Sequence, residues 1–220
     1  MNFWPPILVL DLHITDVCNL HCRWCSQGVP VCSSKEIMPA ARLRELSKLF
    51  SDMCFEEVHV SGGEPTSHAE FDAISRMLRS SFTSKAFMLF TNGYRLVENR
   101  DAACCYDRIY LSHYPGLNDS IMALDLTLFT NVIRTTKTSE LKDVKRAKGS
   151  PDSWHTCPFA RWVKLTSQRI WRCCDAIGIH RLRRVSIESC SVAAEPGWKE
   201  QFMLLNLSPA CRMCPFHLPK

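Results

Sequence analysis

Cys18-Asn19-Leu20-His21-Cys22-Arg23-Trp24-Cys25 is the stretch around which this chain is organised. Its three cysteines fall within eight residues, in the spacing C-x3-C-x2-C. The apolar run at residues 7–10, just before it, predicts a buried strand. The cysteines would then lie on a loop that leaves the carboxyl end of a strand, where α/β folds place their chemistry.

Three thiolates are one fewer than a 4Fe–4S cluster or a closed zinc site normally takes. A cluster held by Cys18, Cys22 and Cys25 would therefore keep one iron open for a further ligand. Two other interpretations remain at this point. The cysteines could form part of a zinc knuckle with His21 or His13 as the fourth ligand, or they could be disulfide partners.

The composition narrows the class of protein. A chain of 220 residues holds one medium domain, alone or with a small appendage. Its net charge of +5 suits an anionic cofactor or redox partner but is too small to indicate nucleic-acid binding. Because there is no long apolar run and no signal-peptide pattern at the N-terminus, we expect a cytoplasmic protein with no membrane partner.

A second motif, Ser61-Gly62-Gly63-Glu64-Pro65-Thr66, follows a strand predicted at residues 56–60. The two glycines remove side chains where a ligand must approach the backbone, and Glu64 offers a carboxylate to an ammonium group. Pro65 stiffens the turn. A capping box at 67–70 then predicts the start of a helix, whose buried face would be Phe71, Ile74, Met77 and Leu78. Strand, glycine loop and capped helix together make a βα unit with a ligand-binding turn.

Further βα units follow the same plan. A strand at 86–90 ends in Thr91 and Asn92, and a strand at 108–111 ends in Ser112 and His113. Isolated histidines at such positions are more often structural than catalytic, so we do not expect His113 to be a base. Other expected elements are a helix after Pro39, a helix capped by Asn118, a fifth strand at 129–135 and a short sixth strand, or a linker, near Val144. This alternation predicts an α/β fold with a parallel sheet and outer helices.

The βα alternation of the sequence ends near residue 150, and a different pattern begins. Alternation on both sides of a polar turn at 167–168 predicts a hairpin, and 198–205 looks helical. Four cysteines around these elements could close a metal site: Cys157, Cys173, Cys211 and Cys214. Cys174 is the alternative to Cys173, and a zinc ribbon competes with an iron–sulfur cluster. The remaining cysteines, expected to be ordinary buried or half-buried thiols, are Cys32, Cys54, Cys104, Cys105, Cys174 and Cys190.

These motifs resemble those of the radical S-adenosylmethionine (SAM) superfamily, whose signature is C-x3-C-x-aromatic-C followed by Gly-Gly-Glu-Pro. The resemblance implies a partial (β/α)6 barrel over residues 1–149. It also implies that Cys18, Cys22 and Cys25 hold a 4Fe–4S cluster whose open iron binds SAM. The residues that the resemblance assigns to SAM are Trp24, Gly62, Gly63, Glu64, Pro65, Thr91, Asn92 and Ser112.

Residues 150–220 resemble the twitch domain, a small α+β relative of the SPASM domain that holds an auxiliary 4Fe–4S cluster. Such an enzyme would cleave SAM to a 5′-deoxyadenosyl radical, using flavodoxin or ferredoxin as electron donor. The radical would abstract a substrate hydrogen atom, and the auxiliary cluster would take the second electron. This implies dehydrogenation of a small polar alcohol such as a sugar or aminocyclitol, because twitch-bearing relatives include an aminocyclitol dehydrogenase.

Two other functions remain open. A maturase could crosslink or epimerise a ribosomally made peptide. An interaction module that is not an enzyme would not bind SAM, and the Gly-Gly-Glu-Pro motif argues against it. Possible substrate contacts are Tyr114, His155 and Arg161.

Overall fold

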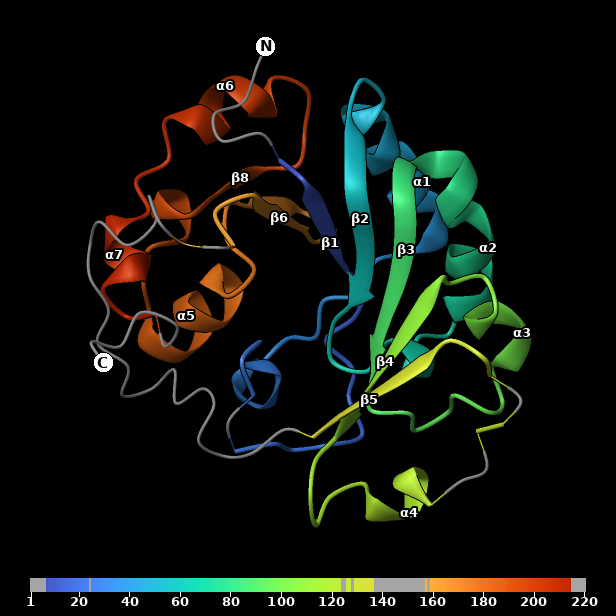
Figure 1. Ribbon diagram of the computed structural model, residues 1–220. Helices are drawn as coiled ribbons and strands as arrows, with labels where there is room; N and C mark the ends of the chain where they lie inside the picture. The colour runs from blue at the N-terminus through green and yellow to red at the C-terminus, as the bar shows by residue number, and fades with distance from the viewer. Residues whose placement is uncertain are drawn as a thin grey trace.

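A computed structural model describes residues 7–23, 25–123, 126–127, 129–136, 157 and 159–214 (Figure 1). Within these residues, eight strands form one sheet in the order β5-β4-β3-β2-β1-β6-β7-β8. The strands are β1 (Val9–His13), β2 (Cys54–Ser61), β3 (Thr83–Thr91), β4 (Arg108–His113), β5 (Val132–Thr136), β6 (Trp162–Leu165), β7 (Arg169–Trp171) and β8 (Ser191–Ala193). The first six are parallel, whereas β7 and β8 are antiparallel. The α/β fold class and its curved parallel sheet are therefore confirmed.

The main core lies between the outer face of this sheet and the helices α1 (Ala40–Ser47), α2 (Phe71–Ser81) and α3 (Arg100–Ala103) (Figure 1). Leu10 and Leu12 of β1 point into this core and are fully buried. Because neighbouring residues of a strand face opposite sides, Asp11 and His13 point to the inner face. The apolar face predicted for α2 is confirmed by its buried Phe71, Ile74, Met77 and Leu78.

The sixth parallel strand differs from the expectation. The region near Val144 lies outside the described residues, and β6 takes the place beside β1, with Lys164 opposite Asp11. The hairpin predicted after residue 160 is confirmed, since β6 pairs with β7. Its first strand thus extends the sheet of the N-terminal region, so one sheet runs through both predicted domains. The boundary at 149–150 also lies outside the described residues.

The capping box predicted at 67–70 is wrong. Pro65–Ser67 forms a separate 3-10 turn, in which the Glu64 carboxylate accepts a hydrogen bond from the Thr66 amide. Helix α2 begins only at Phe71, and Glu70 at its N-cap makes no side-chain cap bond. The 3-10 turn after Glu64 uses Ser67, which the capping box would also need. The turn forms instead because its Thr66 amide donates a hydrogen bond to the buried Glu64 carboxylate.

The C-terminal region adds the helices α5 (Ala176–Arg183), α6 (Trp198–Met203) and α7 (Ser208–Cys211). Trp198 packs on Phe50 with ring centroids 5.1 Å apart and donates to the Leu49 carbonyl at 3.3 Å. Together these contacts fix α6 to the N-terminal core. No helix in the described residues is both long and apolar enough to span a membrane.

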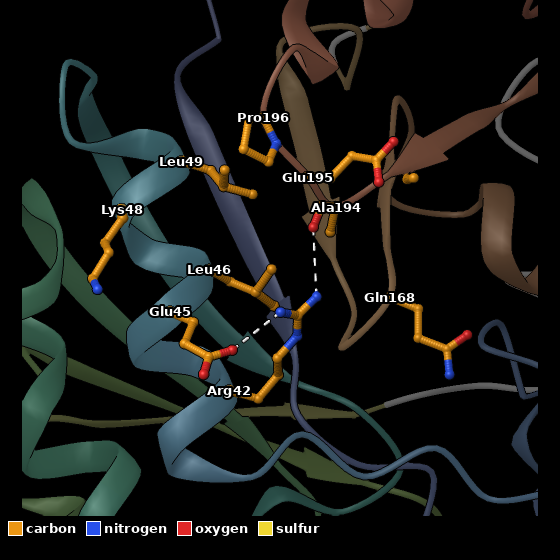
Figure 2. A pocket seen from close by; sticks show the side chains of 10 residues that line it. Arg42, Glu45, Leu46, Lys48, Leu49, Gln168, Ala194, Glu195 and Pro196 are labelled. Carbon is orange, nitrogen blue, oxygen red and sulfur yellow. Dashed lines mark hydrogen bonds and ion pairs between the residues drawn. The ribbon is translucent and has the colours of Figure 1, made fainter.

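A pocket of about 470 Å³ separates α1 from the turn of the hairpin and the end of β8. Figure 2 shows Arg42 crossing it, with its guanidinium 3.2 Å from Glu45 and 3.5 Å from the carbonyl oxygen of Ala194. Arg42 also donates to the Ser167 carbonyl at 3.0 Å. The pocket therefore lies in a second region of contact between the N-terminal helices and the C-terminal region, in addition to the contacts of Trp198, on the outer side of the sheet.

Candidate functional site

The three-cysteine loop leaves the carboxyl end of β1, as predicted. Cys18, Cys22 and Cys25 are half-buried, and the Cys25 amide donates to the Cys22 carbonyl at 3.2 Å. Burial, with the negative charges of Glu64, Cys25 and Cys22, raises the pKa of Cys18 to about 11. A thiol whose charge is disfavoured by burial and by neighbouring negative groups suits a cationic metal centre, which stabilises the thiolate. Trp24 lies outside the described residues.

All thirteen cysteines fall in the described part of the chain and no disulfide joins any two of them, so the disulfide interpretation finds no support. Most of the extra cysteines are buried or half-buried as expected, but Cys54 and Cys104 are exposed. Among the described residues, no group of three or more His, Cys, Asp or Glu is arranged around a single metal ion. What the structure gives is therefore the placement of the thiols and not a formed ligand sphere.

The Gly-Gly pair packs against the three-cysteine loop. The Gly63 amide donates to the Thr15 carbonyl at 2.6 Å, and the Glu64 amide donates to the Val17 carbonyl at 2.8 Å. A Cβ on Gly62 would lie 2.5 Å from the Thr15 carbonyl oxygen, and one on Gly63 would lie 3.0 Å from the Cys18 Cβ. The approach that needs glycine here is thus that of the loop backbone, where the sequence suggested a ligand.

Glu64 joins the ends of β2 and β3. Its carboxylate is fully buried and accepts four hydrogen bonds, from the Thr66 amide and hydroxyl, the Thr91 hydroxyl and the Asn92 amide, at 2.5–3.0 Å. Burial raises the pKa of Glu64, and the donors oppose that shift. Its main visible role is to fix the turn, so contact with an ammonium group stays a prediction.

Two asparagines extend this network to the neighbouring loops. The Asn92 side chain donates to Asn19 Oδ1 at 2.8 Å, which ties the end of β3 to the three-cysteine loop. The buried Asn118 donates to the carbonyls of Asn92 and Ser112, both at 2.9 Å, instead of capping α4 (Asp119–Met122). The predicted rim residues Thr91, Asn92 and Ser112 are therefore brought together, whereas the connecting roles of Asn19 and Asn118 were missed.

The other rim candidates have distinct surroundings. His113 Nε2 lies 2.7 Å from Asp119 Oδ1, a contact that fits the structural role expected for it. Burial raises the pKa of the Tyr114 phenol, and the negative charges of Cys22 and Cys25 raise it further. The carbonyl of Arg161 accepts hydrogen bonds from the amides of Leu8 and Val9 at the start of β1, and His155 lies outside the described residues.

The four C-terminal cysteines line one pocket, together with apolar groups that include Ile179, Leu207 and Ala210. Those cysteines are Cys157, Cys173, Cys211 and Cys214. Cys174 is buried but does not line this pocket. A hydrogen bond from Cys174 lowers the pKa of Cys173, and the same contact with burial raises that of Cys174. Four thiols around one apolar space are the donor set of a four-thiolate zinc or cluster site, although they are not gathered around a single metal ion in this structure.

The inner face of the sheet carries charges that sequence analysis missed. Lys164 Nζ lies 2.8 Å from Asp11 Oδ2 and donates to Gln27 Oε1 at 2.7 Å, and the Ser61 hydroxyl donates to Asp11. Although burial opposes it, the charge of Lys164 lowers the pKa of Asp11. Both members of the Asp11–Lys164 pair are buried.

An aromatic row crosses the same face. His59 lies 4.9 Å from both Trp162 and Phe90, and Phe90 stacks on Tyr110 at 4.7 Å, measured between ring centroids. Trp162, Phe90 and Tyr110 are only half-buried. The face therefore offers partly accessible rings beside a buried ion pair.

A partial barrel of parallel strands, with three cysteines on the loop after β1 and a glycine turn after β2, defines the radical SAM class of fold. Residues 12–113 match the family described as the Radical SAM superfamily. The chain is therefore similar to the radical SAM superfamily over just under half of its length.

Two curated relatives are GTP 3',8-cyclases. The protein of Pasteurella multocida (strain Pm70) is 33% identical over 139 residues, which cover 62% of this chain and 39% of the relative. The protein of Actinobacillus pleuropneumoniae serotype 3 (strain JL03) is 30% identical over 152 residues, with coverages of 66% and 42%. The chain thus spans about two fifths of the length of these relatives.

Solved structures support the fold over almost the whole chain. The crystal structure of BtrN in complex with AdoMet and 2-DOIA superposes with a TM-score of 0.65 and 12% identity, covering 96% of this chain and 87% of BtrN. BtrN in an open conformation gives a TM-score of 0.59, 13% identity and coverages of 94% and 84%. At these identities the likeness concerns the fold alone.

Proposed function

We propose that this protein is a radical SAM enzyme with two 4Fe–4S clusters that oxidises a small polar alcohol such as a sugar or an aminocyclitol. Cys18, Cys22 and Cys25 would hold the first cluster. The observation that carries the proposal is the packing of the three-cysteine loop, at Thr15, Val17 and Cys18, against the Gly62-Gly63 turn, inside the region that matches the superfamily. When bound, the cluster and SAM supply a 5′-deoxyadenosyl radical that abstracts hydrogen from unreactive carbon.

In this proposal the protein's residues bind and orient. Three thiolates leave one corner of a four-iron cluster without a protein ligand, and that corner would take SAM. Gly63 and Glu64 fix the three-cysteine loop through their amides, and Asn92 holds it from β3. The SAM site would be lined by residues at or next to the strand ends, namely Pro65, Thr91 and Ser112. Gly62 and Trp24 would line it as well.

The second cluster would lie in the four-cysteine pocket as part of a twitch-like region. Four thiolates leave no open iron, so such a cluster serves electron transfer and not substrate ligation. Held there, the group would supply a one-electron acceptor. Oxidation of an alcohol would then balance, because one hydrogen atom would leave the carbon for the 5′-deoxyadenosyl radical, one proton would leave the hydroxyl, and the remaining electron would go to that acceptor. The fold likeness to BtrN, which includes the C-terminal region, supports this arrangement.

Three features support the proposed substrate, cellular location and electron donor. The aromatic row beside Asp11 and Lys164 offers both a flat surface and charges to a ring-shaped polar substrate. Thirteen cysteines with no disulfide among them suit a reducing, cytoplasmic setting. The net charge of +5 suits an acidic electron donor such as flavodoxin or ferredoxin.

A second candidate is a reaction on a purine nucleotide. The relatives that are 33% and 30% identical are named as GTP 3',8-cyclases, which favours this candidate. The aromatic row would equally suit a nucleobase. A peptide maturase remains the alternative drawn from the motifs.

The test is a SAM-cleavage assay on the anaerobically reconstituted protein, with aminocyclitols, sugars, GTP or peptides added. We expect 5′-deoxyadenosine that depends on the substrate, together with an alcohol product that has lost two hydrogens. Turnover of GTP without loss of hydrogen would instead support the nucleotide candidate. Absence of 5′-deoxyadenosine with every addition, from protein with full iron content, would contradict the proposal.

A further inference from the structure

Helix α5 lies between the two cysteine sites. It follows Cys173 directly, and the amide of its first residue, Ala176, donates to the Cys173 carbonyl at 3.2 Å. Its Ile179 lines the four-cysteine pocket. The helix contacts both α7, which ends at Cys211, and the 3-10 turn Val29–Val31 that follows the three-cysteine loop (Figure 1). One short element therefore touches both sites.

The face of α5 toward the three-cysteine loop makes close backbone contact. A Cβ on Gly178 would lie 2.7 Å from the carbonyl carbon of Ser26, the residue after Cys25, so only glycine fits there. A Cβ on Gly28 would lie 2.9 Å from the Cβ of Arg181. Gly28 also has φ 66°, in the region that favours glycine. The downstream end of the loop is thus seated directly on α5.

Arg181 connects the same helix to the upstream end of the loop. Its guanidinium makes two parallel contacts of 2.8 Å with Asp16 and donates to the Gln27 carbonyl at 3.1 Å. Asp16 is fully buried and also accepts from His13 at 2.7 Å and from the Glu36 amide at 3.0 Å. Because a bidentate arginine–carboxylate pair fixes direction as well as distance, Arg181 holds both ends of the loop in one orientation.

We propose that α5 is a rigid connector in which Gly178 and Arg181 position the three-cysteine loop relative to the four-cysteine pocket, so that the state of one site affects the other. This inference rests on the proposed function, because it needs metal at both sites. Ligation of Cys173 would fix the position of the start of α5. Because the helix is rigid, Arg181 and Gly178 would then be fixed too, and with them Asp16 and the Ser26 backbone that they contact. Arg181 is on this account a positioning residue for the SAM-binding cluster.

Arg181→Gln tests the connector, with Arg181→Lys as the conservative variant. Arg184→Gln is the matched control, because Arg184 is the C-cap residue of the same helix but is exposed. The readouts are iron per chain and the electron paramagnetic resonance (EPR) spectrum of the reduced protein during a SAM titration. We expect Arg181→Gln to keep the C-terminal iron but to weaken SAM binding at the first cluster about tenfold. Arg181→Lys should recover part of this loss, and Arg184→Gln should match the wild type.

Arg181→Gln with wild-type iron content and wild-type SAM affinity would overturn the connector. If Arg181→Gln is insoluble, Cys173→Ala carries the test, since it changes the pocket and leaves the loop contacts intact. The connector then requires SAM affinity at the first cluster to fall severalfold, and an unchanged affinity overturns it. A wild type with no SAM-dependent signal would overturn the proposed function itself, which is a separate result.

Discussion

Gly63→Ala is the sharpest test of how the cysteine loop is held. The new Cβ would lie 2.8 Å from the Val17 carbonyl carbon and 3.0 Å from the Cys18 Cβ. Carbon atoms in good contact are about 3.5–4.0 Å apart, so the loop would have to move by roughly 0.5–1 Å. The movement would carry Cys18 away from the Gly-Gly turn.

The cost has two parts. Overpacking of a tight contact costs about 1–3 kcal/mol in the free energy of unfolding. The movement also strains the hydrogen bonds from Gly63 to Thr15 at 2.6 Å and from Glu64 to Val17 at 2.8 Å. Each such bond contributes about 0.5–1.5 kcal/mol. The sum is about 2–6 kcal/mol, which for a protein of this size lowers the Tm by roughly 4–24 °C.

Thermal unfolding of reconstituted protein, combined with iron analysis, measures both consequences. We expect Gly63→Ala to lose iron from the first cluster and to show the lower Tm. Gly116→Ala is the control, because a Cβ there meets nothing within 4 Å although its φ is 77°. The control should lose a little stability and keep all its iron. A Gly63→Ala protein with the wild-type Tm and iron content would refute the packing argument.

Three further changes follow from the polar network. Lys164→Met leaves the Asp11 carboxylate buried without its cation, so the unfolding free energy at pH 7 should fall by about 3–5 kcal/mol. Since Lys164 lowers the pKa of Asp11, wild-type stability from this pair is present above about pH 4 and lost below it. Without Lys164, burial raises the pKa of Asp11. Urea titrations should therefore show that the loss of unfolding free energy relative to the wild type becomes smaller as the pH falls, and a loss that does not change with pH would contradict this. Asn118→Ala removes two donated hydrogen bonds and should cost about 2–3 kcal/mol and weaken SAM binding severalfold in calorimetry; unchanged affinity would separate Asn118 from the SAM site. Arg184→Gly should raise the unfolding free energy by up to about 1 kcal/mol, because Arg184 has φ 55°, and a fall in Tm would refute this.

Local patterns were sufficient to predict most of the fold. Alternation and helical spacing depend only on neighbouring residues, so the five N-terminal strands and the buried face of α2 were found. The rim residues Thr91, Asn92 and Ser112 were found for a related reason, because parallel strands end at one edge of a sheet. The paired ends of these strands did bring them together.

Long-range contacts explain what was missed. Strand β6 is too short to reveal its partner, and β1 lies about 150 residues earlier. The Arg181–Asp16 pair joins residues 165 apart, and no local pattern announces it. The capping-box prediction failed because the residues after Glu64 form a turn whose Thr66 amide donates to the buried Glu64 carboxylate. In each case tertiary contacts decide between locally acceptable arrangements.

Metal analysis of four proteins tests the two-cluster account most directly. Wild type, a Cys18/Cys22/Cys25→Ala variant, Cys173→Ala and Cys174→Ala would each be reconstituted without oxygen and assayed for iron, zinc and 5′-deoxyadenosine. The account predicts about eight, four, four and eight irons per chain, respectively, since each cluster holds four. It also predicts 5′-deoxyadenosine from the wild type and none from the triple variant. About four irons plus zinc in the wild type would contradict the second cluster, and with it the proposed oxidation.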